Sequence, residues 1–143
     1  MDANNQRDRA RLDVRQVPIH SDLDIVAARI EGRNLAKELG FGIIDQARIA
    51  TAISELARNV LLYAQSGQMT LMRLLREGKT GIEILCQDQG PGIRDVEHIL
   101  AQEPSIKHGH GVGLPGTKRL MDEFEIHSQP GRGTTIIARK WVS

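Results

Sequence analysis

Two polar side chains stand one helical turn apart in a segment that has the apolar spacing of a helix. Glu55 and Asn59 lie within the predicted helix 44–64 and project from a different side than its apolar stripe. The amide oxygen of Asn59 suits Mg²⁺, which shares its shell with water and phosphates. Glu55 is placed to orient or deprotonate a hydroxyl. The alternative is a solvated helix face. For Arg58 we expect a surface ion pair or a partner contact rather than catalysis.

An acidic residue ends a predicted strand and is followed by two glycines. Asp88 has the parity of Ile82, Ile84 and Cys86, so its carboxylate is expected on the covered side of the sheet. A carboxylate there can accept a hydrogen bond from the exocyclic amine of adenine, with Gly90 and Gly92 leaving room for the flat base. Asp and Gly are also ordinary turn residues. The parity favours the binding interpretation.

A third signal is the glycine-rich segment 109–115, directly before a predicted helix. Free N–H groups and a partial positive charge at a helix N-terminus favour phosphate binding, and glycines allow close approach to the backbone. The alternative is an ordinary flexible connection. No strand leads into the segment, which excludes a Rossmann fingerprint, and the lysine-serine ending of a P-loop is absent. The three signals together correspond to the metal and proton, adenine and triphosphate parts of a nucleotide site.

The elements that would position these residues follow from apolar spacing and turn residues. An edge strand is predicted from Leu12 to Ile19 and contains Pro18. A helix follows, with Ser21 as its cap, Asp24 at the capping-box position and Gly40 as its stop. Its predicted apolar face consists of Leu23, Val26, Ala27, Ile30, Leu35 and Leu39. The helix 44–64 has its own apolar stripe, made of Ile49, Ile53, Leu56, Ala57, Val60 and Ala64.

The second half of the chain is predicted to be mainly strands. Strands 69–76 and 82–88 flank a turn at 78–81, and strands 124–128 and 134–141 flank a turn at 130–133. Between the pairs we expect a short helix 94–101, a mobile loop 102–110 and a helix 114–121 with Pro115 in its first turn. This order predicts an α/β two-layer domain rather than alternating βαβ units.

Composition describes an ordinary globular chain. It has 143 residues and a formal net charge of +1, so nucleic acid is not an expected partner. No run is long and apolar enough to span a bilayer, so a membrane is not expected either. The one cysteine, Cys86, lies in an apolar run and fits a reducing compartment. We expect a flexible leader over 1–10, a single domain over 11–143 and a cytoplasmic protein.

Together with the segment 131–134, Gly-Arg-Gly-Thr, the three signals resemble the GHKL ATPase superfamily (gyrase, Hsp90, histidine kinases, MutL). Glu55 to Asn59 resembles its N box, 88–92 its adenine-binding glycine box and 109–113 its phosphate-binding box. The resemblance covers nearly the whole chain after residue 11. It implies the Bergerat fold, a two-layer sandwich of a mixed, mostly antiparallel sheet covered by helices on one face, with ATP and Mg²⁺ as cofactors.

The resemblance also implies roles for single residues. Glu55 would be the catalytic base, Asn59 the Mg²⁺ ligand and Asp88 the adenine anchor, with the hydroxyl of Thr134 supporting it. Whether Lys107 or His108 closes on the terminal phosphate stays open. The remaining expected nucleotide contacts are Gly90, Gly92, Ile93, Lys107, Gly109, His110, Gly111, Val112, Gly113, Leu114 and Thr134.

Within the superfamily, the short length and the run 113–124 are most similar to the small serine/threonine kinases of bacterial partner-switching systems. The stressosome switch kinases are the closest likeness. They imply phosphorylation of a STAS-domain antagonist protein and binding of a PP2C-type phosphatase after release. One alternative is an anti-sigma-factor kinase that sequesters a sigma factor. Another is a non-catalytic module in which ATP gates partner choice, although the intact Glu55 speaks against it. We expect neither a histidine autokinase nor a gyrase-like or Hsp90-like clamp.

Overall fold

The computed structural model of the chain describes residues 14–93, 100–101 and 113–143. The predicted leader 1–10, most of the predicted helix 94–101 and the predicted loop 102–110 lie outside these residues.

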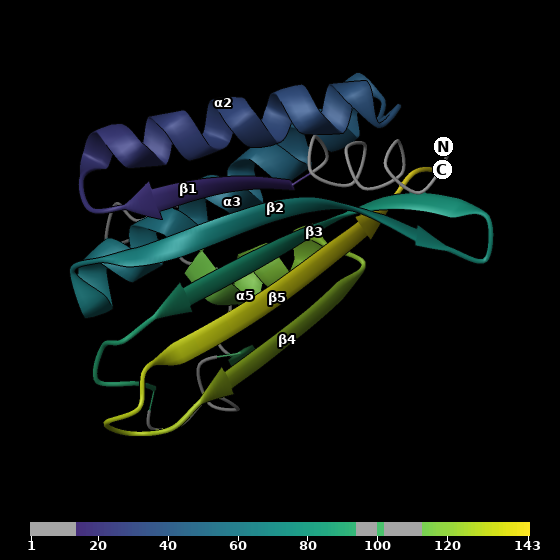
Figure 1. The fold of residues 1–143 in the computed structure, drawn as a ribbon. Coiled ribbons are helices and arrows are strands. Elements are labelled where there is room, and N and C mark those ends of the chain that lie inside the picture. Colours follow the sequence, from purple (N-terminus) through teal and green to yellow (C-terminus); the bar gives the residue numbers. More distant parts are fainter. Residues whose placement is uncertain (1–13, 94–99, 102–112) are drawn as a thin grey trace, which may run out of the picture.

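An antiparallel sheet of five strands is the platform of the described structure (Figure 1). The strands are β1 (Val14–Ile19), β2 (Gly67–Arg76), β3 (Lys79–Asp88), β4 (Glu123–Ser128) and β5 (Thr134–Trp141). They lie in the order β1-β2-β3-β5-β4, and every described ladder is antiparallel. The predicted α/β architecture is therefore confirmed, with no parallel pairing among the described strands. Because β1 is an edge strand, Pro18 lies where its missing N–H is tolerated.

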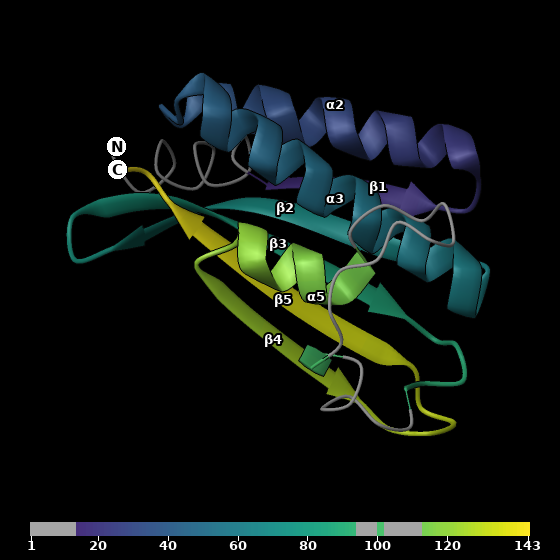
Figure 2. The ribbon, with the colours of Figure 1, turned by 180° about the vertical axis from the view of Figure 1, so that it is seen from behind.

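Helices cover one face of the sheet (Figures 1 and 2). They are α2 (Asp22–Glu38), α3 (Ile43–Ala64) and α5 (Gly113–Leu120). α2 begins as predicted, because the carboxylate of Asp24 accepts hydrogen bonds from the N–H groups of His20 and Ser21 at 2.7 and 3.2 Å. It ends at Glu38, and the predicted stop, Gly40, follows the cap residue Leu39 with φ +97° and an N–H that donates to the Lys37 carbonyl. No described helix combines the length and the apolar character needed to span a membrane.

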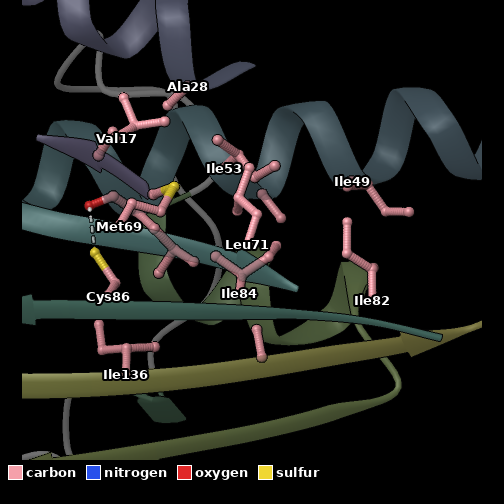
Figure 3. Close-up of a cluster of buried hydrophobic side chains, with 14 of the residues drawn as sticks. Val17, Ala28, Ile49, Ile53, Met69, Leu71, Ile82, Ile84, Cys86 and Ile136 are labelled. Carbon is pink, nitrogen blue, oxygen red and sulfur yellow. Dashed lines mark hydrogen bonds between the residues drawn. The ribbon is translucent and has the colours of Figure 1, made fainter. Parts of the chain in front are cut away.

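The core lies between α3 and the central strands (Figure 3). The predicted stripe of α3 is confirmed, since Ile49, Ile53 and Leu56 are fully buried. It packs on the face of β2 and β3 formed by Met69, Leu71, Ile82, Ile84 and Cys86. The alternation along β3 turns Asp88 to this same covered side, as its parity predicts.

The buried face of α2 differs from the prediction. Leu23, Val26 and Ile30 are exposed. A Cβ added at Gly32 would lie 1.9 Å from Cδ1 of Ile53, so α2 packs against α3 through its side with small residues. Leu23, Val26 and Ile30 remain outside, whereas Ile25 and the predicted Leu35 are buried together with the small residues. The buried residues are Ile25, Ala28, Gly32, Leu35 and Ala36.

The first hairpin turn is shorter than predicted. Arg76 pairs with Lys79, so the turn consists of Glu77 and Gly78, which both have positive φ (51° and 79°). Positive φ at both positions is typical of a type I′ turn, which matches strand twist. Gly81, expected in the turn, lies within β3, where a Cβ would meet the ring of Trp141 at 2.6 Å.

Candidate active site

Helix α3 presents Glu55 and Asn59 beside its buried stripe. Glu55 is buried although it is charged, and Asn59, one turn further, is half-buried. Polar residues on a helix usually face water. The burial of a carboxylate therefore requires specific partners, because an unpaired buried charge is costly.

Among the described residues, two groups contact the Glu55 carboxylate. Nη1 of Arg58 lies 2.7 Å from its Oε1 atom, and the N–H of Gly113 donates to its Oε2 atom at 3.4 Å. Gly113 is the first residue of α5, and its carbonyl accepts a hydrogen bond from the buried Thr117 hydroxyl at 2.7 Å. The start of α5 is thus fixed against the middle of α3.

Asp88 is buried at the end of β3. Its Oδ1 atom accepts a hydrogen bond from the Gly90 N–H at 2.9 Å. The pKa of the nearby Cys86 thiol is raised to about 12, first by burial and second by the negative charge of Asp88. Cys86 is therefore a buried thiol that stays protonated, as expected from its apolar run.

Packing alone requires glycine at both glycine positions after Asp88. A Cβ at Gly90 would lie 2.5 Å from Cβ of Ala64, the last residue of α3. A Cβ at Gly92 (φ +81°) would lie 2.2 Å from the backbone oxygen of Gln129, in the β4–β5 turn. Both glycines let the turn approach neighbouring backbone, in addition to any room they leave for a ligand.

A hydroxyl pair lies beside Asp88 and is not apparent from the sequence. Thr134 is directly opposite Asp88 in the β3–β5 ladder, but its hydroxyl lies 2.8 Å from that of Ser128. Ser128 Oγ accepts from the Ile93 N–H at 2.6 Å and donates to the Gly133 carbonyl at 3.1 Å. Since a hydroxyl has one proton, Thr134 must be the donor to Ser128. The pair anchors the chain at Ile93.

Helix α3 is the element against which the described parts of the predicted site meet. Glu55, near its middle, contacts Gly113 at the start of α5. Its last residue, Ala64, lies against Gly90 after β3, and Asn59 is between these contacts in sequence. The other predicted residues, Lys107, His108, Gly109, His110, Gly111 and Val112, lie outside the described residues.

Sequence comparisons show the family of the chain. Residues 19–140 match the histidine kinase-like ATPase domain. The chain is 56% identical over 126 residues to the serine/threonine-protein kinase RsbT of Bacillus subtilis (strain 168), covering 88% of this chain and 95% of that one. It is 32% identical over 115 residues to an anti-sigma F factor of Caldanaerobacter subterraneus subsp. tengcongensis, covering 75% and 78%.

Two solved structures share the fold. The structure of the RsbU and RsbW domains of Rv1364c from Mycobacterium tuberculosis superimposes with a TM-score of 0.59 at 19% identity. The superposition covers 89% of this chain but only 32% of the Rv1364c chain. The SiaB–SiaC complex from Pseudomonas aeruginosa gives a TM-score of 0.55 at 14% identity, with 99% of both chains covered. At these identities the likeness concerns the fold alone.

Proposed function

Since the chain belongs to the histidine kinase-like ATPase family, together with the serine/threonine-protein kinase RsbT, we propose that it is an ATP-dependent protein kinase. It transfers the terminal phosphoryl group of ATP to a serine or threonine of a STAS-domain protein. The observation that carries the proposal is the position of α3, which contacts both the turn after Asp88 and the start of α5.

Asp88 is the residue proposed to hold adenine. Its Oδ1 atom is engaged by the Gly90 N–H, and no bond between described residues engages Oδ2. That oxygen can accept a hydrogen bond from the exocyclic amine of the base. Ile93, whose N–H is fixed by Ser128, packs against the core beside this turn and offers an apolar contact to the ring. Thr134, paired to Ser128, supports the same corner.

The phosphates are proposed to lie at the start of α5. The N–H groups of Gly113 and Leu114 belong to its first turn, where backbone donors and the helix dipole favour anions. The Gly113 N–H would exchange its long contact with Glu55, at 3.4 Å, for a phosphate oxygen. Asn59 supplies a neutral oxygen that fits Mg²⁺, and no cluster of three His, Cys, Asp or Glu side chains competes with it among the described residues. When bound, Mg²⁺ would neutralise charge on the phosphates. Lys107, Gly109, His110, Gly111 and Val112 stay predicted contacts.

Glu55 is proposed to align the substrate hydroxyl. The hydroxyl oxygen forms a bond to the terminal phosphorus, the bond to the bridging oxygen breaks, ADP leaves, and Glu55 takes the hydroxyl proton late. Positioning and charge stabilisation provide most of the catalysis in such transfers. A base of this kind contributes about 10² to 10⁴ in rate.

The partners are proposed from the relatives. A STAS-domain protein is the substrate, and a PP2C-type phosphatase is bound once the kinase is released from it. The 32% identity to an anti-sigma F factor favours a second candidate, a kinase that also sequesters a sigma factor. Pull-downs with a purified phosphatase and a purified sigma factor separate the two, because only one should be retained.

The test is to incubate the protein with ATP, Mg²⁺ and a purified STAS-domain partner and to weigh the partner by mass spectrometry. A gain of one phosphoryl group is expected with the wild type, and a rate lower by about 10² to 10⁴ with Glu55→Gln. No gain in mass would refute the kinase assignment. An unchanged rate in Glu55→Gln would refute the role of Glu55.

A further inference from the structure

In the described part of the chain, the shortest contact of Glu55 comes from its own helix. The side chain of Glu55 is 8% exposed, and its Oε1 atom lies 2.7 Å from Arg58 Nη1. The contact from Gly113 N–H, at 3.4 Å, is long for a hydrogen bond. Charge-assisted contacts of Arg with carboxylate are the stronger kind. Arg58 therefore determines where the Glu55 carboxylate points.

The two carboxylate oxygens have different surroundings. Oε1 is held by Arg58, while Oε2 faces Gly113 at the start of α5. Under the proposed function, the phosphates and the attacking hydroxyl lie on the Oε2 side. We propose that Arg58 is a positioning residue for phosphoryl transfer, which fixes one oxygen of Glu55 so that the other faces the reacting groups. This inference rests on the proposed function.

The position of Arg58 suits an indirect role. Its side chain is 39% exposed, so it lies on the outer side of the nearly buried Glu55. It acts on the reaction through Glu55 rather than by touching the nucleotide. Loss of Arg58 should therefore lower kcat and leave the affinity for ATP unchanged, whereas a direct phosphate contact would show in both.

The same helix offers a matched control. Arg48 and Asp45 form an ion pair with the same spacing of three residues, at 2.9 Å, in the first turns of α3. Arg48 is 53% exposed, and pairs of this kind contribute little to stability. Asp45 and Arg48 lie ten residues before Glu55 and Arg58, respectively, and are remote from the site. Arg48→Ala removes an ion pair of the same spacing without touching Glu55, and Asp45 keeps Lys140 at 3.9 Å.

The experiment compares Arg58→Ala, Arg58→Lys and Arg48→Ala in phosphorylation of a purified STAS-domain protein, with ATP affinity measured by calorimetry. Arg58→Ala should lower kcat about 10- to 100-fold, as expected for a misplaced catalytic group, with the ATP Kd within about twofold. Arg58→Lys should recover part of the rate, because it keeps the charge but not the planar fork. Added guanidinium should partly restore Arg58→Ala. Arg48→Ala should match the wild type.

A double variant decides whether Arg58 acts through Glu55. Adding Arg58→Ala to Glu55→Gln should cause no further loss, since nothing is left to position. A multiplicative loss, or an ATP affinity that falls as far as kcat, would overturn the inference. So would an Arg58→Ala rate within about threefold of wild type while Glu55→Gln is impaired. If Glu55→Gln itself keeps the full rate, the role of Glu55 is refuted and the inference about Arg58 is overturned with it, whereas absence of transfer by the wild type would refute the proposed kinase function.

Discussion

Replacing Gly92 by alanine tests the packing that holds the turn after Asp88. Two costs can be worked from the structure. The first is backbone conformation, because Gly92 has φ +81°, a region that costs an L-residue about 1–2 kcal/mol. The second is steric, because the new Cβ would lie 2.2 Å from the backbone oxygen of Gln129, which cannot rotate away. Overpacking of this kind costs a further 1–3 kcal/mol, so we expect about 2–5 kcal/mol in total.

Gly131 separates the two costs. It has φ +79°, no neighbour within 4 Å of an added Cβ, and an N–H that donates to the Pro91 carbonyl at 2.7 Å. Gly131→Ala should therefore cost only about 1–2 kcal/mol. Urea unfolding gives both free energies, and calorimetry should show ATP affinity reduced at least about tenfold in Gly92→Ala only. Equal destabilisation by the two variants would refute the close contact of Gly92 with Gln129.

In Asp88→Asn the amide oxygen keeps the hydrogen bond from the Gly90 N–H, and an NH₂ donor replaces Oδ2, the acceptor proposed for the adenine amine. ATP binding measured by calorimetry should therefore be lost; wild-type affinity would contradict the adenine role. Because burial and Asp88 raise the pKa of the Cys86 thiol to about 12, only about one thiol in 10⁴ is ionised at pH 8. Iodoacetamide should react far more slowly with the native protein than with the urea-unfolded one, and equal rates would be inconsistent with this burial. The indole N–H of Trp141 donates to Glu123 and, with Arg76 and Arg139, lowers the pKa of that carboxyl. A lowered folded-state pKa gives stability that is present above the unfolded-state pKa and lost as pH falls through the folded value. Fluorescence of Trp141, the only tryptophan, should therefore titrate below the usual glutamate range, and Glu123→Gln should abolish the transition.

The sequence predicted the fold best where the apolar spacing allows a single interpretation. The bounds of β5 and the stripe of α3 were correct because one residue set repeats at the right period. In α2, Leu23 and Val26 have the same helical spacing as the residues that are buried instead. Which of these residues are buried depends on the close approach of Gly32 to Ile53, which is distant in sequence. Local spacing contains no information about that contact.

The predictions for the candidate site were also correct where the local pattern decides the position of a residue, and missed residues whose position depends on a distant contact. The inward position of Asp88 follows from strand parity alone. Ser128 could not be found, because its contact with Thr134 arises only when β4 and β5 pair. For Arg58 we expected a surface ion pair or partner contact. It does form an ion pair, but with Glu55, and the spacing of three residues was the available signal.

The most direct test of the account is a crystal structure with Mg²⁺ and a non-hydrolysable ATP analogue. The central claim is that one nucleotide lies along α3, with its adenine at Asp88 and its phosphates at the start of α5. The account predicts the adenine amine within hydrogen-bond distance of Asp88 and the phosphates at the start of α5, beside Glu55 and Asn59. A nucleotide bound elsewhere, with side chains filling the space between α3 and the end of β3, would contradict it.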